Sequence, residues 1–228
     1  MSGLSAGTGL IASWRNTALL LGLFSADFLL AFSLRGRLPY LGRIGLMTAL
    51  EWAFFLVTWL GIRQRRVITA AGVIGGRWPN ARAVARDIGY AALLLVGTQL
   101  VAAALHGYLH AGRAPEAIHR LIPHGKWESI AFLLLATTAG FVEEFVFRGY
   151  LQAQFNALTR NFPGASALQV AIFGAMHISF GWKRAFGIPV WSLGWTYVAR
   201  ESKSLRPLMI CHAGMDSLLA LVQFLPGG

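Results

Sequence analysis

The sequence is poor in charged residues, and in acidic residues above all. Only 13% of its 228 residues are charged, against roughly 25% in soluble domains. So few charges cannot cover a soluble enzyme with an ordinary polar surface. They also argue against a nucleic-acid-binding protein, which would be rich in charge, and we expect no nucleic-acid partner. The hydrophobic content of 56% excludes a disordered chain.

Cysteine is nearly absent. Cys211 is the single cysteine of the sequence, so no internal disulfide can form. The chain is instead rich in apolar residues and in positive charge, with 20 Lys and Arg against 9 Asp and Glu. This combination is typical of an all-α, polytopic transmembrane helix bundle with basic residues in short loops. At roughly 20 residues per span, the chain has room for about seven helices, with six to eight as the range. We therefore expect a multi-pass protein of the cell (inner) membrane, in contact with the lipid bilayer.

Seven apolar runs separated by polar or basic residues are the expected spans. They are residues 17–34, 41–62, 88–105, 127–147, 165–180, 186–198 and 205–225. We treat residues 1–228 as a single membrane domain, with N-terminal helices and a basic cytoplasmic loop in 1–126 and motif-bearing helices in 127–228. The first run is expected to be a retained helix, because it is long for a signal-peptide core and no clear cleavage site follows it.

The basic residues favour a cytoplasmic N-terminus, since more of the loop lysines and arginines then lie on the cytoplasmic side. The densest cluster runs from Arg63 to Arg86, with apolar residues interleaved. This segment is either an interfacial stretch on an anionic membrane leaflet or a plain cytoplasmic loop.

Several ionisable residues lie inside the apolar runs. They are Asp27, Glu51, Glu143, Glu144, His177, His212 and Asp216. Each ionisable group at mid-membrane costs on the order of 3 kcal/mol, so it usually has a functional or pairing reason. For Asp27 and Glu51, which are single residues on separate helices, we expect structural roles as buried hydrogen-bonding groups or as partners of a nearby arginine.

The first motif is EExxxR at residues 143–148. Glu144 and Arg148 are four residues apart, so on a helix they share a face and can pair. Glu143 then points about 100° away and is free to face another group. Taken alone, these residues fit two interpretations equally well. One is an ion pair beside a glutamate that is free for chemistry, and the other is an interfacial ion pair with the arginine extended toward the polar lipid region.

The second and third motifs are FxxxH at residues 173–177 and HxxxD at residues 212–216. A stripe of small residues at 167, 171 and 175 predicts that another helix approaches closely near His177. His212 and Asp216 share a helix face. Taken singly, His177 could be a packed core histidine, and the His212–Asp216 pair could be a polar seam between helices.

The three motifs in this order resemble the CPBP family, which comprises intramembrane proteases related to the CAAX-processing endopeptidase and to bacteriocin-processing and immunity (Abi) proteins. The resemblance covers about residues 141–219. CAAX enzymes usually carry asparagine at the position of Asp216, whereas many bacterial relatives carry aspartate. This departure weakens the assignment of a CAAX substrate more than the assignment of a protease.

The resemblance implies an intramembrane endopeptidase that acts on a membrane-associated protein or peptide. It implies that Glu143 and His177 activate the attacking water. His212 and Asp216 would orient and stabilise the oxyanion. These roles fit peptide hydrolysis, which needs a base for the water and a donor to the developing negative charge.

The resemblance also implies supporting residues. Glu144 and Arg148 would hold the site together, and Phe173 would pack beside it. An ionised aspartate would repel an oxyanion, so we expect Asp216 either to be protonated or to orient His212 by a hydrogen bond.

A zinc mechanism is the alternative for the same residues. Two histidines and a carboxylate with an open position form a catalytic zinc set, so Glu143, His177 and His212 would be the ligands of a zinc-type enzyme. The resemblance favours a glutamate-type mechanism, for which we expect no cofactor.

Two other function classes compete with the protease. A non-catalytic bacteriocin-immunity or scaffold membrane protein would not need the ionisable residues for chemistry. A proton-coupled transporter would use the intramembrane carboxylates as a relay, although no internal repeat of the kind common in transporters is visible.

Overall fold

The computed structural model describes residues 9–34, 37–109 and 116–221, and in these ranges it contains helices and no strand. The helices, in chain order, are α1 (Trp14–Ser33), α2 (Tyr40–Arg65), α3 (Ala70–Ile74), α4 (Ala81–Tyr108), α5 (Glu116–His119), α6 (Lys126–Glu143), η2 (Glu144–Leu151), α7 (Gln152–Thr159), α8 (Phe162–Met176), η3 (Ile178–Phe180), α9 (Trp182–Ser202) and α10 (Arg206–Leu221). The expected all-α bundle is confirmed.

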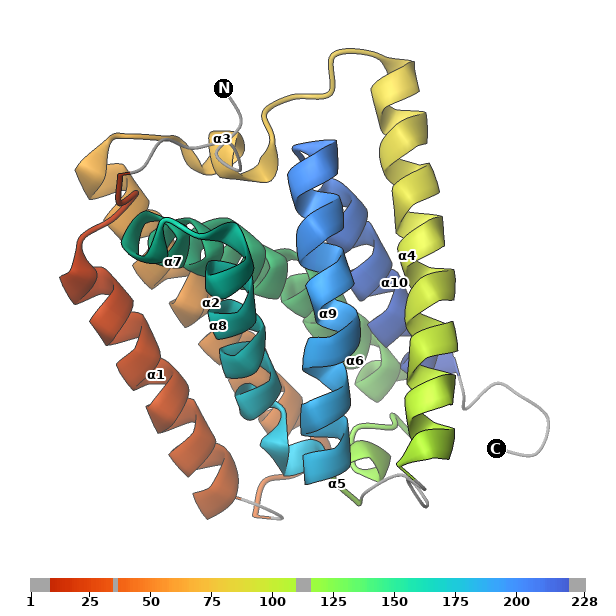
Figure 1. Ribbon diagram of the computed structural model, residues 1–228. Helices are drawn as coiled ribbons and strands as arrows, with labels where there is room; N and C mark the ends of the chain where they lie inside the picture. The colour runs from red at the N-terminus through yellow and green to blue at the C-terminus, as the bar shows by residue number, and fades with distance from the viewer. Residues whose placement is uncertain (1–8, 35–36, 110–115, 222–228) are drawn as a thin grey trace.

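The long helices run up and down the bundle, and α6 lies among them between α2 and α10 (Figure 1). The helical stretch Lys126–Thr159, made of α6, η2 and α7, is also the most buried of the apolar helices. A buried cluster joins side chains from α1 and α2 to side chains from η2, α8, α9 and α10. The N-terminal helices therefore share one core with the motif-bearing helices.

Each of the seven apolar runs contains a long helical segment of the described chain. Four segments are long and apolar enough to cross a membrane, namely α1, α2, α4 and the stretch Lys126–Thr159. α8 is apolar but has 15 residues, which is short for a crossing. The run predicted to end at residue 147 instead continues as a helix to Thr159, because η2 and α7 follow α6 without a break.

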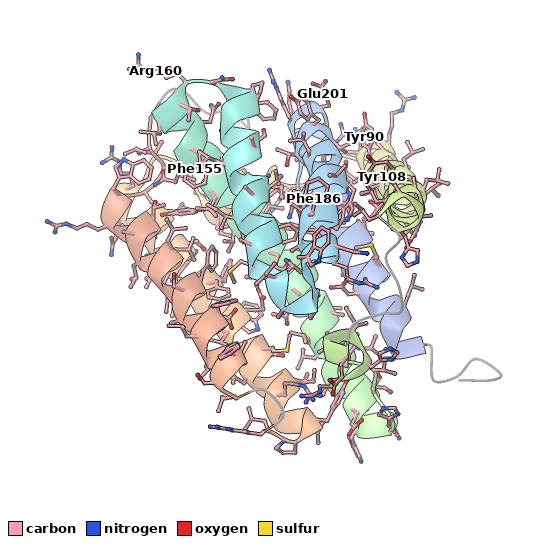
Figure 2. All side chains as sticks on the ribbon, turned by 60° about the horizontal axis from the view of Figure 1, so that its bottom comes forward. Tyr90, Tyr108, Phe155, Arg160, Phe186 and Glu201 are labelled. Atoms are coloured by element: carbon pink, nitrogen blue, oxygen red, sulfur yellow. The ribbon has the colours of Figure 1, made fainter. Side chains whose placement is uncertain are left out.

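The outer surfaces of the long helices are apolar. On α4 the exposed side chains include Ile88, Leu93, Val96 and Leu100, and Tyr108 projects at the end of this helix (Figure 2). Soluble monomers rarely expose continuous apolar surfaces of this kind, whereas a lipid-facing surface requires them.

The loops predicted to share one side of the membrane lie at one end of the bundle. The loop after α2, the α7–α8 turn and the α9–α10 turn meet there (Figure 1). Arg160 and Glu201 mark this end in Figure 2. The alternation of helix directions agrees with the predicted grouping of the loops, while the cytoplasmic identity of this end remains a prediction.

The basic segment 63–86 is folded against the bundle, while its position on a membrane leaflet stays a prediction. It contains α3, whose Val73 is buried against η2. The Trp78 indole donates a 2.8 Å hydrogen bond to Asp87, and Asp87 also accepts a hydrogen bond from Ser204 at 3.1 Å. The segment is thus tied to the start of α4 and to the α9–α10 turn.

The predicted stripe of small residues on α8 is not a helix contact. Ala167, Ala171 and Ala175 are all exposed. The buried face lies one position away, where a Cβ added at Gly174 would come within 2.4 Å of the Pro189 ring on α9. Spacing alone indicated the right kind of surface but placed it on the wrong face of the helix.

The closest approach of two helix backbones near the motifs is between α6 and α10. A Cβ added at Gly140 would lie 2.5 Å from the backbone nitrogen of Ala213. Real Cβ atoms essentially never come this close to backbone atoms, so only glycine fits. Because His212 precedes Ala213, this contact fixes how near His212 comes to α6.

We expect Gly140→Ala to destabilise the bundle by about 1–3 kcal/mol, the usual effect of overpacking. Gly97→Ala is the matched control, since Gly97 lies within α4 and has no atom within 4 Å of an added Cβ. The control should unfold at or slightly above the wild-type temperature, because alanine favours helix. Thermal unfolding of both variants in detergent checks the prediction, and equal melting temperatures would contradict it.

Candidate active site

The three motifs meet in the interior of the bundle. Glu143 ends α6, Glu144 and Arg148 belong to η2, Phe173 and His177 lie at the end of α8, and His212 and Asp216 lie on α10. Residues far apart in the sequence, such as Glu144 and His212, are in direct contact. The structure therefore brings together all of the residues that the motifs single out.

The π-helical geometry of η2 begins at the first motif. All eight residues of this segment, Glu144–Leu151, are buried. A π-helix widens the turn locally and occurs mostly at functional sites. The widened turn occurs where the chain must direct two consecutive glutamates at different partners.

Glu144 and Arg148 form the expected ion pair, with 3.0 Å between Oε1 and Nη1 and no solvent exposure of either side chain. The Arg148 guanidinium also donates to the Ser192 hydroxyl on α9. Its centre lies 4.3 Å from the centroid of the Phe173 ring, which is a cation–π distance. The alternative of an arginine extended toward the lipid interface is wrong, because Arg148 points into the bundle.

Glu144 also holds His212. Its Oε1 accepts a hydrogen bond from His212 Nδ1 at 2.8 Å, so a single carboxylate oxygen binds both Arg148 and His212. This contact fixes the ring and directs Nε2 away from Glu144. Nε2 lies 3.7 Å from Glu143 Oε2 and 3.5 Å from Asp216 Oδ2.

The ring of His212 is thus oriented at Nδ1 by Glu144, and Asp216 Oδ2 lies 3.5 Å from Nε2 with a side chain that is 35% exposed. The expected role of Asp216 stays a prediction. Nothing in the sequence indicated the contact between Glu144 and His212, because Glu144 already had a partner four residues away on its own helix.

His177 lies where α8 ends, on the other side of the Phe173 ring. Its Nδ1 is 2.8 Å from the backbone carbonyl oxygen of Phe173, and a carbonyl can only accept. Nδ1 therefore carries the hydrogen, and in the neutral ring Nε2 is the nitrogen able to accept a proton. The ring packs 4.7 Å from the Phe173 ring, centroid to centroid.

A small cavity separates His177 from Glu143. Its volume is about 20 Å³, enough for a single water molecule. The polar side chains in its wall are Glu51, Glu143 and His177, and the rest of the wall is apolar. A water needs two to four polar partners to be held in a protein, and these three side chains supply them.

The cavity divides the site into two parts. Glu143 and His177 line it, whereas His212 and Asp216 do not and lie on the far side of Glu143. Glu143 Oε2 is buried without a hydrogen-bond partner among the described residues. A buried carboxylate in the wall of a water-sized cavity is chemically suited to accept a proton from water.

Three groups near the site were not predicted as site residues. Glu51 reaches the cavity from α2, Ser192 binds Arg148, and Trp195 packs 5.7 Å from the His212 ring. Glu51 was singled out as a carboxylate in an apolar run, but with a structural role. Nothing in the sequence pointed to Ser192 or Trp195.

A zinc set is not assembled in this arrangement. Among residues 9–34, 37–109 and 116–221, no three His, Cys, Asp or Glu side chains are grouped so that they could hold a metal ion. His212 Nδ1 and His177 Nδ1 are engaged in hydrogen bonds, as in histidines that bind a metal through the other nitrogen, so the spacing of the groups is what speaks against a zinc set. Glu143, His177 and His212 would have to move to become ligands.

One family model matches the chain. Residues 125–218 match the family described as type II CAAX prenyl endopeptidase Rce1-like, and this range holds all three motifs. The match confirms the resemblance drawn from the motifs and supports membrane protease activity in general. No curated protein and no solved structure matches the chain.

We expect Arg148→Met to destabilise the protein by about 3–5 kcal/mol, because it leaves the Glu144 carboxylate buried without its partner. The double variant Glu144→Gln, Arg148→Met removes both charges and should recover part of this loss. Thermal unfolding in detergent is the measurement.

The control for Arg148→Met is the pair Arg120–Glu116, also four residues apart but exposed to solvent. Arg120→Met should change stability by at most about 1 kcal/mol, as is usual for exposed pairs. If Arg148→Met behaved like Arg120→Met, the buried pair would not stabilise the fold.

Proposed function

We propose that the chain is an intramembrane endopeptidase that hydrolyses a peptide bond of a membrane-associated protein or peptide with a water activated by Glu143 and His177. The observation that carries the proposal is the cavity of about 20 Å³ with these two side chains in its wall. The match to the CAAX endopeptidase family supports the same reaction class. The cell (inner) membrane is the proposed location.

The first half of the reaction needs a base beside the water. Glu143 takes one proton from the water while His177 Nε2 accepts the other hydrogen in a hydrogen bond and orients the oxygen. The water oxygen forms a bond to the substrate carbonyl carbon. The apolar wall of the cavity, which includes Phe147 and Phe173, keeps other water away from the reacting atoms.

The second half needs support for negative charge on the carbonyl oxygen. His212 lies on the other side of Glu143, and its Nε2 faces away from Glu144. Donation from Nε2 while Nδ1 donates to Glu144 requires the imidazolium, and the carboxyl groups of Glu143, Glu144 and Asp216 supply the opposite charge. Asp216 in its protonated form would be a second donor.

Collapse of the tetrahedral intermediate breaks the carbon–nitrogen bond. The proton held by Glu143 passes to the departing amine nitrogen, so the carboxylate returns to its initial state. No step needs a cofactor, and we propose a glutamate-type mechanism.

We expect Glu143→Gln to lower kcat by about 10²- to 10⁴-fold, the usual contribution of a general base. The full-length protein in detergent is assayed by mass spectrometry on a prenylated peptide with a CAAX carboxyl terminus and on the same peptide without the prenyl group. The matched control is Glu201→Gln, since Glu201 is exposed at the end of α9. The control should keep wild-type activity, and full activity of Glu143→Gln would contradict the proposal.

We expect cleavage to survive a strong chelator, because the proposed steps use only side chains of the chain. Activity and bound metal are measured on the same sample before and after chelation, the metal by mass spectrometry. Loss of activity on chelation, with recovery on addition of zinc, would contradict the glutamate-type mechanism and favour the zinc alternative.

A further inference from the structure

Glu51 lies on the side of the water cavity contributed by α2. The sequence suggested a structural role for it, either as a hydrogen-bonding group or as the partner of an arginine. None of the ion pairs formed by the described residues includes Glu51, and its Oε2 atom is buried without a hydrogen-bond partner. Glu51 is therefore not held by an arginine in this structure.

The partner of Glu51 is Glu143. Their carboxyl groups are within hydrogen-bonding reach of each other, and both line the cavity with His177. Two carboxyl groups in such contact are joined by a hydrogen that one of them carries, because two adjacent carboxylates would repel each other. The contact links α2 to the residue that the proposed mechanism uses as a base.

The contact with Glu51 limits how the Glu143 carboxylate can rotate. A carboxylate next to a cavity can rotate, and a misdirected base loses much of its rate advantage. Hydrogen bonding to Glu51 on one side restrains that rotation. Glu143 Oε2 also lies 3.7 Å from His212 Nε2, so the carboxylate is held between Glu51 and His212 while it lines the cavity.

We infer that Glu51 is a positioning residue, which donates a hydrogen bond to Glu143 and thereby orients its carboxylate toward the water cavity. The inference rests on the proposed function, because it assigns Glu51 to the same reaction. It goes beyond the three motifs, which all lie in the C-terminal half of the chain, and gives α2 a part in the site.

Two substitutions distinguish the effect of the hydrogen bond that Glu51 donates from the effect of the volume of its side chain. Glu51→Gln keeps an NH₂ donor for Glu143, whereas Glu51→Met keeps a similar length without a donor. We expect Glu51→Met to lower kcat by about 10- to 100-fold with KM within about twofold of wild type, and Glu51→Gln to stay within about threefold of wild-type kcat. Glu201→Met is the control for the substitution itself.

The kinetic results can overturn the inference in two ways. Unchanged kcat in Glu51→Met would show that Glu51 does not orient Glu143. Equal losses in both variants would show that a donated hydrogen bond is not what matters. Thermal unfolding of each variant is measured alongside.

A second measurement tests the contact without using activity, and it also applies if Glu51→Met fails to fold. Infrared spectra should show the carbonyl band of a protonated carboxylic acid in the wild type, altered in both Glu51→Gln and Glu143→Gln but unchanged in Glu201→Gln. Absence of that dependence would overturn the inference. Full activity of Glu143→Gln would instead refute the proposed function, so the two failures are distinguishable.

Discussion

Oε1 of Glu144 accepts hydrogen bonds from Arg148 and from His212 inside the bundle, where neither partner of the ion pair is exposed to solvent. An unpaired charge in such a place costs several kcal/mol, so these groups must stay together. They come from η2 and α10, and the Arg148 side chain also reaches Ser192 on α9. The need to keep this buried charge paired therefore dictates how the C-terminal helices are assembled.

The close packing of the bundle follows from the same requirement. His212 can reach Glu144 only if α10 lies against α6, and that approach is possible because Gly140 has no side chain to meet Ala213. On the other side, Phe173 covers the guanidinium of Arg148 and also contacts the ring of His177. The position of His177 therefore depends on the ion pair through one aromatic ring.

The sequence was sufficient to predict interactions within a single helix. The Glu144–Arg148 pair followed from a spacing of four residues, and the helical fold followed from the apolar runs. Contacts between helices could not be predicted in this way, because periodicity does not say which face of one helix meets which face of another. The three alanines of α8 show this limit, since their spacing was right but Gly174 makes the contact with α9.

Glu51 and Glu144 show why pairing is harder to predict than burial. Both are acidic residues in apolar runs, and the sequence justified expecting a partner for each. For Glu144 the predicted partner on its own helix was correct. The prediction was incomplete, because the same carboxylate oxygen also accepts a hydrogen bond from His212, 68 positions away. For Glu51 the expectation was a buried hydrogen bond or an arginine partner, and the group within hydrogen-bonding reach is another glutamate.

The pair of Glu51 and Glu143 lies in the wall of the cavity, so the hydrogen that joins the two carboxyl groups lies beside the group proposed to take a proton from water. The consecutive residues Glu143 and Glu144 then divide two tasks. Glu144, fully buried and paired with Arg148, stays fixed. Glu143, at 17% exposure and 3.7 Å from His212, lines a water-sized cavity. The two carboxylates approach the two nitrogens of the same His212 ring, so adjacent positions of one helix supply both the group that holds the site and the group proposed to act in it.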